Sequence, residues 1–63
     1  MRVMCGDFAM EIEWVRLNGK QLVFKGLDGT RYHTDDYFSD NIAYCKLNDL
    51  VVNGYIRVDS MHT

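Results

Sequence analysis

Apolar and polar residues alternate strictly in the first part of the chain. From Phe8 to Trp14 every second residue is large and apolar, and the positions between them include Glu11 and Glu13. A period of two places the apolar side chains on one face of a β-strand and the carboxylates on the other. We therefore predict a half-buried strand in this segment, with its apolar face toward the core.

The alternation slips by one residue after Trp14. Val15 and Leu17 are apolar, and Arg16 between them is charged. A slip of one residue moves every later side chain to the other face unless the strand accommodates an extra residue. We therefore predict a β-bulge near Trp14–Val15, with Trp14 inside the core beside Ile12.

Three Asx-Gly dipeptides lie between the apolar runs. Asn and Gly tolerate the positive φ angles of tight hairpin turns, so Asx-Gly between apolar runs is a strong hairpin signal. Asn18-Gly19 and Asp28-Gly29 predict a three-stranded meander over residues 8–34. Asn53-Gly54 predicts a further hairpin, or one bent strand with a bulge, within residues 50–58.

The stretch that follows the meander permits two interpretations. In the first, Thr34 caps a helix over residues 35–47. The apolar stripe of that helix consists of Phe38, Ile42 and Cys45. In the second, a loop or single helical turn near residues 35–40 leads into a strand over residues 42–47. We favour the second interpretation because Ile, Tyr and Cys are mediocre helix formers.

These elements predict one mainly β domain over residues 1–63. It is an antiparallel meander of four to five strands closed into a small SH3-like or OB-like barrel, with a helical turn near residues 35–40. An α+β fold with a helix at 35–47 packed on the sheet is the alternative. Residues 61–63 are expected to fray unless a partner holds them. The hydrophobic content of 48% exceeds what so small an interior encloses easily, so exposed apolar groups and a partner site are expected.

Charge is distributed unevenly along the chain. The formal net charge of −2 argues against wholesale binding of polyanions. Residues 16–34 nevertheless contain four basic residues and one aspartate, whereas residues 35–49 contain four aspartates and one lysine. Two electrostatic faces are therefore expected.

The sequence predicts a soluble, cytoplasmic protein without a cofactor. The N-terminal residues lack the apolar stretch of a secretory signal, and no run approaches the ~20 apolar residues of a membrane span. Cys5 and Cys45 have no Cys-x-x-Cys spacing, so we expect both to be reduced and at least partly buried.

Catalytic and metal-binding patterns are weak. Candidate nucleophiles would need a base, and His33 and His62 supply the only imidazoles. His33 lies near Asp35, Asp36 and Asp40, but their spacing matches no zinc or calcium motif. We therefore predict neither an enzyme nor a metal site.

The acidic segment has the composition of a protein-contact loop. Two adjacent aromatic rings lie among carboxylates, and aromatic residues are enriched at the energetic centres of interfaces. We therefore predict a non-enzymatic module, such as a small inhibitor or accessory subunit, that binds a larger protein or a nucleic-acid-processing complex. The predicted contact residues are Asp35, Asp36, Tyr37, Phe38, Asp40 and Tyr44. Phe38 either plugs the barrel or contacts the partner, and an intermediate arrangement places Phe38 inside and Tyr37 outside.

Two other functions remain as alternatives. The basic segment would bind nucleic acid by pairing phosphates and stacking bases on a twisted sheet. The residues of that alternative are Arg16, Lys20, Lys25, Arg31 and Tyr32. A structural subunit of a homo-oligomer is the other alternative, because exposed apolar surface also suits self-association.

Overall fold

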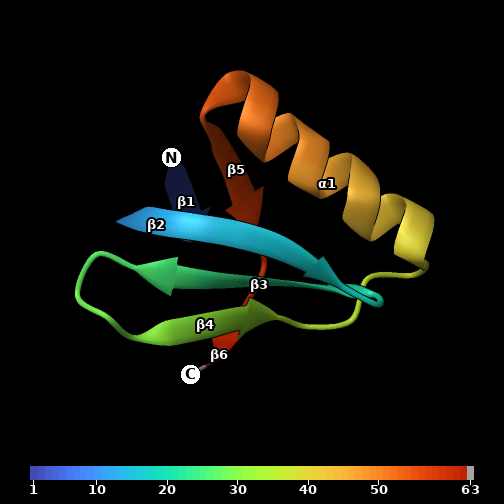
Figure 1. Cartoon of the computed structure of the whole chain (residues 1–63), viewed down its shortest axis with the longest axis horizontal. Coiled ribbons are helices and arrows are strands. Elements are labelled where there is room, and N and C mark those ends of the chain that lie inside the picture. The colour runs from blue at the N-terminus through green and yellow to red at the C-terminus, as the bar shows by residue number, and fades with distance from the viewer. Residues whose placement is uncertain (63) are drawn as a thin grey trace.

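The computed structural model describes residues 1–62 and contains a six-stranded mixed sheet with one helix packed against it (Figure 1). In chain order the elements are β1 (Arg2–Cys5), β2 (Phe8–Asn18), β3 (Gln21–Gly26), β4 (Arg31–Thr34), α1 (Asp40–Asn53), β5 (Tyr55–Val58) and β6 (Met61–His62). The strand order across the sheet is β5-β1-β2-β3-β4-β6. The prediction of a mainly β domain is confirmed, with six strands rather than four to five. The sheet is mixed rather than wholly antiparallel, because β1 and β5 are parallel. A helix at 40–53 replaces both the helical turn near 35–40 and the alternative helix at 35–47.

The predicted meander is confirmed, because β2, β3 and β4 pair as antiparallel neighbours. Asn18 lies opposite Gln21, so Gly19 and Lys20 form a two-residue turn. Gly19 has a φ of 62° and no described non-glycine residue has a positive φ. A positive φ at only the first central residue is the type II′ pattern, which suits the twist of a hairpin.

A first hairpin, between β1 and β2, was missed by the sequence reasoning. Cys5 lies opposite Phe8 around a turn in which Gly6 has a φ of 61°. Gly-Asp is itself a two-residue hairpin signal, but only a short strand precedes it here. On its other side β1 pairs in parallel with β5, where Val3 lies opposite Ile56 and both are buried.

The strand predicted over residues 42–47 is wrong, because residues 40–53 form α1. Ser39 rather than Thr34 caps the helix, and the Ser39 hydroxyl accepts a hydrogen bond from the Ile42 N–H at 3.2 Å. The inward side of α1 carries Ala43, Leu47 and Leu50. The predicted stripe of Phe38, Ile42 and Cys45 is exposed instead. Packing on the sheet therefore overrides the modest helix propensity of this segment.

Asn53-Gly54 ends α1 rather than forming a hairpin. Gly54 has a φ of 75°, and its N–H donates to the Leu50 carbonyl at 2.8 Å. A glycine in the left-handed region after the last helical residue is a common helix terminus. Further on, Met61–His62 pairs with β4 as β6, so the expected fraying is wrong for these two residues, and Thr63 lies outside the described residues.

The predicted bulge in β2 is confirmed, but it precedes Trp14 instead of following it. Glu13 is the extra residue between the pairs Ile12–Gly26 and Trp14–Lys25. Because a one-residue shift moves a side chain to the other face, Trp14 leaves the core side of the sheet. The prediction that Trp14 packs beside Ile12 in the core is therefore wrong.

The core lies between α1 and the inner face of the sheet. Its buried hydrophobic residues are Val3, Ile12, Leu22, Phe24, Leu50, Ile56 and Val58. Figure 1 shows α1 along one side of the sheet, with β1 and β5 running steeply across the β2–β3–β4 meander. The edge strands β5 and β6 are separated in the chain only by Asp59 and Ser60, so the sheet curls toward a barrel. No helix within residues 1–62 is long and apolar enough to cross a membrane.

Candidate functional site

Most of the predicted partner-contact residues lie in the loop of residues 35–39, which connects β4 to α1, or just after it. Asp36 and Phe38 are exposed in this loop, and Asp40 and Tyr44 are exposed on the first turns of α1. The structure therefore gathers these four side chains at the N-terminal end of the helix.

In the loop Tyr37 lies inside and Phe38 lies outside, which is the reverse of the predicted intermediate arrangement. Tyr37 packs against the core, and its N–H donates to the Lys20 carbonyl at 2.8 Å. Burial raises the pKa of the Tyr37 phenol. The side chain of Phe38 is 92% exposed. Phe38 is therefore free to contact another molecule, and Tyr37 holds the loop to the domain.

Asp35 contacts the C-terminal strand rather than solvent alone. Its carboxylate accepts a hydrogen bond from the Ser60 hydroxyl, and its Oδ1 lies 2.5 Å from Nε2 of His62. The hydrogen bond from Ser60 and then that from His62 lower the pKa of Asp35. Asp35 therefore joins the loop to β6, and 64% of its side chain stays exposed.

The side of α1 that faces away from the sheet carries no charge. Six exposed residues occupy an arc of about 120° at the helical spacing of 100° per residue. They are Asn41, Tyr44, Cys45, Asn48, Val51 and Val52, and we call them the helix surface. Tyr44, Val51 and Val52 are 60%, 62% and 70% exposed. Sequence reasoning missed Val51 and Val52 because it assigned them to a strand.

Carboxylates border the helix surface on both sides. At the same helical spacing, Asp40 falls at one boundary of the uncharged arc and Asp49 at the other. Asp36 adds a third exposed carboxylate just before the helix. The helix contains a single cation, Lys46, which is partly buried on the side toward the sheet. The helix surface is therefore uncharged, with Asn41 and Asn48 along its middle and apolar side chains on both sides of them, and carboxylates border it.

Three of the predicted basic residues share the outer sheet face, the side of the sheet that α1 does not cover. They are Arg16 on β2, Lys25 on β3 and Arg31 on β4. Lys20 lies in the turn between β2 and β3. Tyr32 belongs to the inner face, where its ring stacks on Phe24 with the centroids 6.1 Å apart. The structure therefore does not bring Lys20 and Tyr32 to this basic face.

Trp14 lies at the centre of the basic residues. The guanidinium carbons of Arg16 and Arg31 are 5.3 and 5.8 Å from the centre of its ring. Lys25 pairs with Glu13 at 3.5 Å, but neither arginine forms an ion pair with a carboxylate of residues 1–62. The bulge at Glu13 creates this arrangement by turning Trp14 outward.

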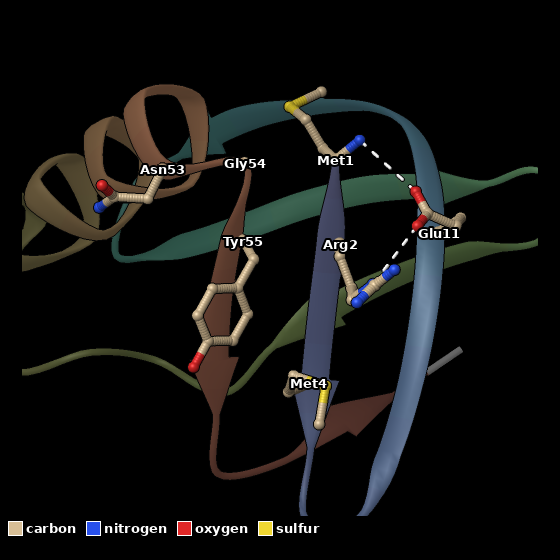
Figure 2. A pocket seen from close by; sticks show the side chains of 7 residues that line it. All are labelled: Met1, Arg2, Met4, Glu11, Asn53, Gly54 and Tyr55. Atoms are coloured by element: carbon tan, nitrogen blue, oxygen red, sulfur yellow. Dashed lines mark hydrogen bonds and ion pairs between the residues drawn. The ribbon is translucent and has the colours of Figure 1, made fainter.

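A cavity of about 500 Å³ opens where β1, β2 and β5 meet the end of α1 (Figure 2). It is lined by Met1, Arg2, Met4, Glu11, Asn53, Gly54 and Tyr55. Glu11 faces the Met1 amino group at 3.6 Å and the Arg2 Nε at 3.4 Å. The lining contains no serine, cysteine or histidine, so it offers no nucleophile with an imidazole base.

Groups that carry out chemistry are dispersed. The described residues contain no cluster of three or more His, Cys, Asp or Glu side chains that would hold a metal ion. Cys5 and Cys45 are free thiols on different elements. Cys45 is exposed, so the expectation that both cysteines are at least partly buried is wrong for this residue.

Comparison with protein-family models, curated proteins and solved structures finds no match to this chain. Functional inference therefore rests on the arrangement of its own residues.

Proposed function

We propose that this protein is a non-enzymatic interaction module, a small inhibitor or accessory subunit, that binds a larger protein through Phe38 and the helix surface. One observation carries the proposal. Phe38 is 92% exposed beside a helix whose outward side holds Tyr44, Val51 and Val52 without a single charge. Exposed apolar surface of this kind marks interaction sites on small soluble domains. A cytoplasmic setting, where free thiols stay reduced, fits the two free cysteines.

The charges around the surface favour a protein over a membrane. A helix that lies on a membrane carries Lys and Arg beside its apolar face, where they meet anionic lipid. Here Asp40 and Asp49 occupy those positions, and a lipid headgroup layer would repel them. A protein groove with an apolar floor and a basic rim matches both properties.

The same charges favour a different protein over a second copy. In a two-fold dimer the patch packs against its own copy, so the acidic border formed by Asp36, Asp40 and Asp49 would face a second border of the same negative charge. Only Lys46 offers a compensating cation on α1. The proposed partner is therefore a heterologous protein with a basic rim.

Capture from a nuclease-treated lysate of the natural source, followed by affinity measurement with the purified partner, tests the proposal. The variant Y44Q/V51Q/V52Q removes the apolar surface with residues that favour a helix at least as well. We expect it to stay folded and to lose at least about 2 kcal/mol of binding free energy, roughly 30-fold in affinity.

Leu27→Gln is the matched control, because Leu27 is 70% exposed in the β3–β4 turn, away from α1. It should bind like the wild type. A stoichiometric partner that the triple variant retains would overturn the proposed surface. A melting midpoint that rises with protein concentration, with no other protein captured, would assign the surface to a homo-oligomer instead.

A further inference from the structure

The outer face of β2, β3, β4 and β6 presents cations and rings in two cross-strand rows. The first row runs through Trp14, Lys25 and Arg31, which are opposite one another in the registers of the three strands. The second row consists of Arg16, Val23, His33 and His62. α1 packs on the inner face, so it does not cover these side chains.

Arg16 and Arg31 form a site without a counterion. Both guanidinium groups lie within 6 Å of the centre of one indole ring, so each makes a cation–π contact with Trp14. Neither has a carboxylate partner within residues 1–62. Arginine binds phosphate oxygens through paired N–H donors, so phosphate groups are the ligands that this pair accepts best.

Ring surfaces on the same face suit the bases of a nucleic acid. The His33 and His62 rings are neighbours across β4 and β6, with their centroids 5.3 Å apart. Trp14 supplies a third ring beside both arginines. Unpaired bases stack on aromatic side chains, and proteins that bind single strands combine such rings with a cationic surface.

Glu13 and Asp35, two carboxylates close to the outer face, each have a partner there. Glu13 faces Lys25 at 3.5 Å and Asp35 faces His62 at 2.5 Å. The exposed aspartates near the helix surface belong to the other side of the domain. An acidic peptide would satisfy the arginines but leave the three rings unused.

We propose that the outer face of β2, β3, β4 and β6 binds single-stranded nucleic acid, with Arg16 and Arg31 contacting backbone phosphates and Trp14, His33 and His62 providing stacking surfaces. This inference is independent of the proposed protein interface, which lies on α1. It also replaces Lys20 and Tyr32 of the sequence-based set with residues that share one face.

Fluorescence anisotropy with labelled 20-nucleotide single strands of RNA and DNA tests the proposal. Each phosphate contact contributes about 0.7 to the slope of log affinity against log salt, so two to three contacts predict a roughly 7- to 18-fold loss between 50 and 200 mM salt. R16Q/R31Q should weaken binding at least tenfold and reduce that slope by about 1.4.

K20Q/K46Q is the control of equal charge change, because both lysines lie off the outer face. It should alter the affinity less than about twofold, because salt screens charges that do not contact the ligand. Circular dichroism and melting establish that both variants fold. Equal losses in the two variants, or no binding by the wild type at 50 mM salt, would overturn the site.

Two further ligands separate the sources of affinity. Inorganic polyphosphate has the charge without bases and should bind more weakly than the oligonucleotides. Polyglutamate that competes as well as the oligonucleotides would assign the face to an acidic protein and overturn the proposal. Y44Q/V51Q/V52Q should bind oligonucleotides normally, so failure of one interface is distinguishable from failure of the other.

Discussion

The backbone N–H of Leu22 donates a hydrogen bond to the hydroxyl oxygen of Thr34, 3.1 Å away inside the core. The backbone register between β3 and β4 ends one residue earlier, at Val23 and His33. The Thr34 side chain therefore extends the pairing by one residue at the end of β4, where Thr34 also lies opposite Met61 of β6. Thr34 is the only buried polar residue among those described.

Thr34→Val is expected to lower the free energy of unfolding by about 1–3 kcal/mol, because the isosteric side chain leaves a buried N–H without an acceptor. Urea denaturation measures the change. Thr34→Ser keeps the hydroxyl and should retain the hydrogen bond, so it should lose less stability than the valine variant. Equal losses in both variants would assign the effect to packing instead.

Tyr37 and Phe38 are expected to separate stability from binding. Tyr37→Ala removes a ring that packs against the core and should cost about 1–3 kcal/mol of unfolding free energy. Phe38→Ala should change stability by less than about 0.5 kcal/mol, because the ring is 92% exposed. In a partner-binding assay the order should reverse, with a loss of about 2 kcal/mol or more for Phe38→Ala.

Tyr37→Phe is the control for this pair, since it keeps the ring. Within residues 1–62 the buried Tyr37 hydroxyl has no hydrogen-bond partner, so its removal should leave stability unchanged or slightly raised. A large loss in this variant would contradict the assigned packing of Tyr37.

The meander was predictable because its turns and its strands give the same signal. Asn18-Gly19 and Asp28-Gly29 lie between runs that alternate, and local turn chemistry agrees with the hydrophobic period. Asn53-Gly54 has the same turn chemistry but ends a helix, since a positive φ also suits a helix terminus. The dipeptide alone therefore does not decide between the two structures.

α1 and the helix surface were harder to predict, because the small and β-branched residues of this segment do not have the pattern or propensity typical of a helix. Ala43 is fully buried, as the strand interpretation expected, whereas the helix interpretation placed its stripe one position away on Ile42. Val51 and Val52 favour a strand by propensity, although they are exposed at the end of α1. Tertiary packing decides such a segment, and the sequence pattern carries little of that information.

The set of residues on the outer sheet face depends on where the one-residue bulge in β2 lies. Moving the bulge from Trp14–Val15 to Glu13 transfers Trp14 from the core to the outer face, beside Arg16 and Arg31. The alternation of residues 8–14 fits either placement, because a bulge shifts the phase wherever it occurs. The sequence therefore predicted Arg16 and Arg31 of the candidate phosphate site, but it did not predict that Trp14 lies beside them.

Acid should loosen the contact between the loop and β6. The pKa of Asp35 is lowered by Ser60 and His62, so these contacts stabilise the folded state above the unfolded pKa of about 3.8. That stabilisation is lost as the pH falls through the lower, folded pKa. Asp35→Asn should therefore show a shallower loss of stability than the wild type as the pH falls below about 3.8.

Asp36→Asn is the matched control for this pH series, because Asp36 makes no hydrogen bond or ion pair with residues 1–62 through its side chain. Its acid limb should follow that of the wild type. NMR titration of the His62 ring signals locates the change at β6. If Asp35→Asn left these signals unchanged, the contact between Asp35 and His62 would be contradicted.

Cys45 offers a direct report on the helix surface. It is exposed on α1 between Tyr44 and the valines, whereas Cys5 is partly buried and its thiol lies 3.8 Å from the Asp59 carbonyl. The single-cysteine variants C5S and C45S should therefore differ in reaction with a maleimide, with Cys45 modified faster because of its exposure. Addition of the partner protein should slow the reaction of Cys45 at least tenfold and leave the reaction of Cys5 unchanged.

A bulky maleimide adduct on Cys45 should in turn block binding of the partner, because the adduct occupies the surface that the partner would cover. Normal binding by the Cys45 adduct would place the partner elsewhere on the domain, and equal protection of both thiols would indicate a general change in stability rather than contact at α1.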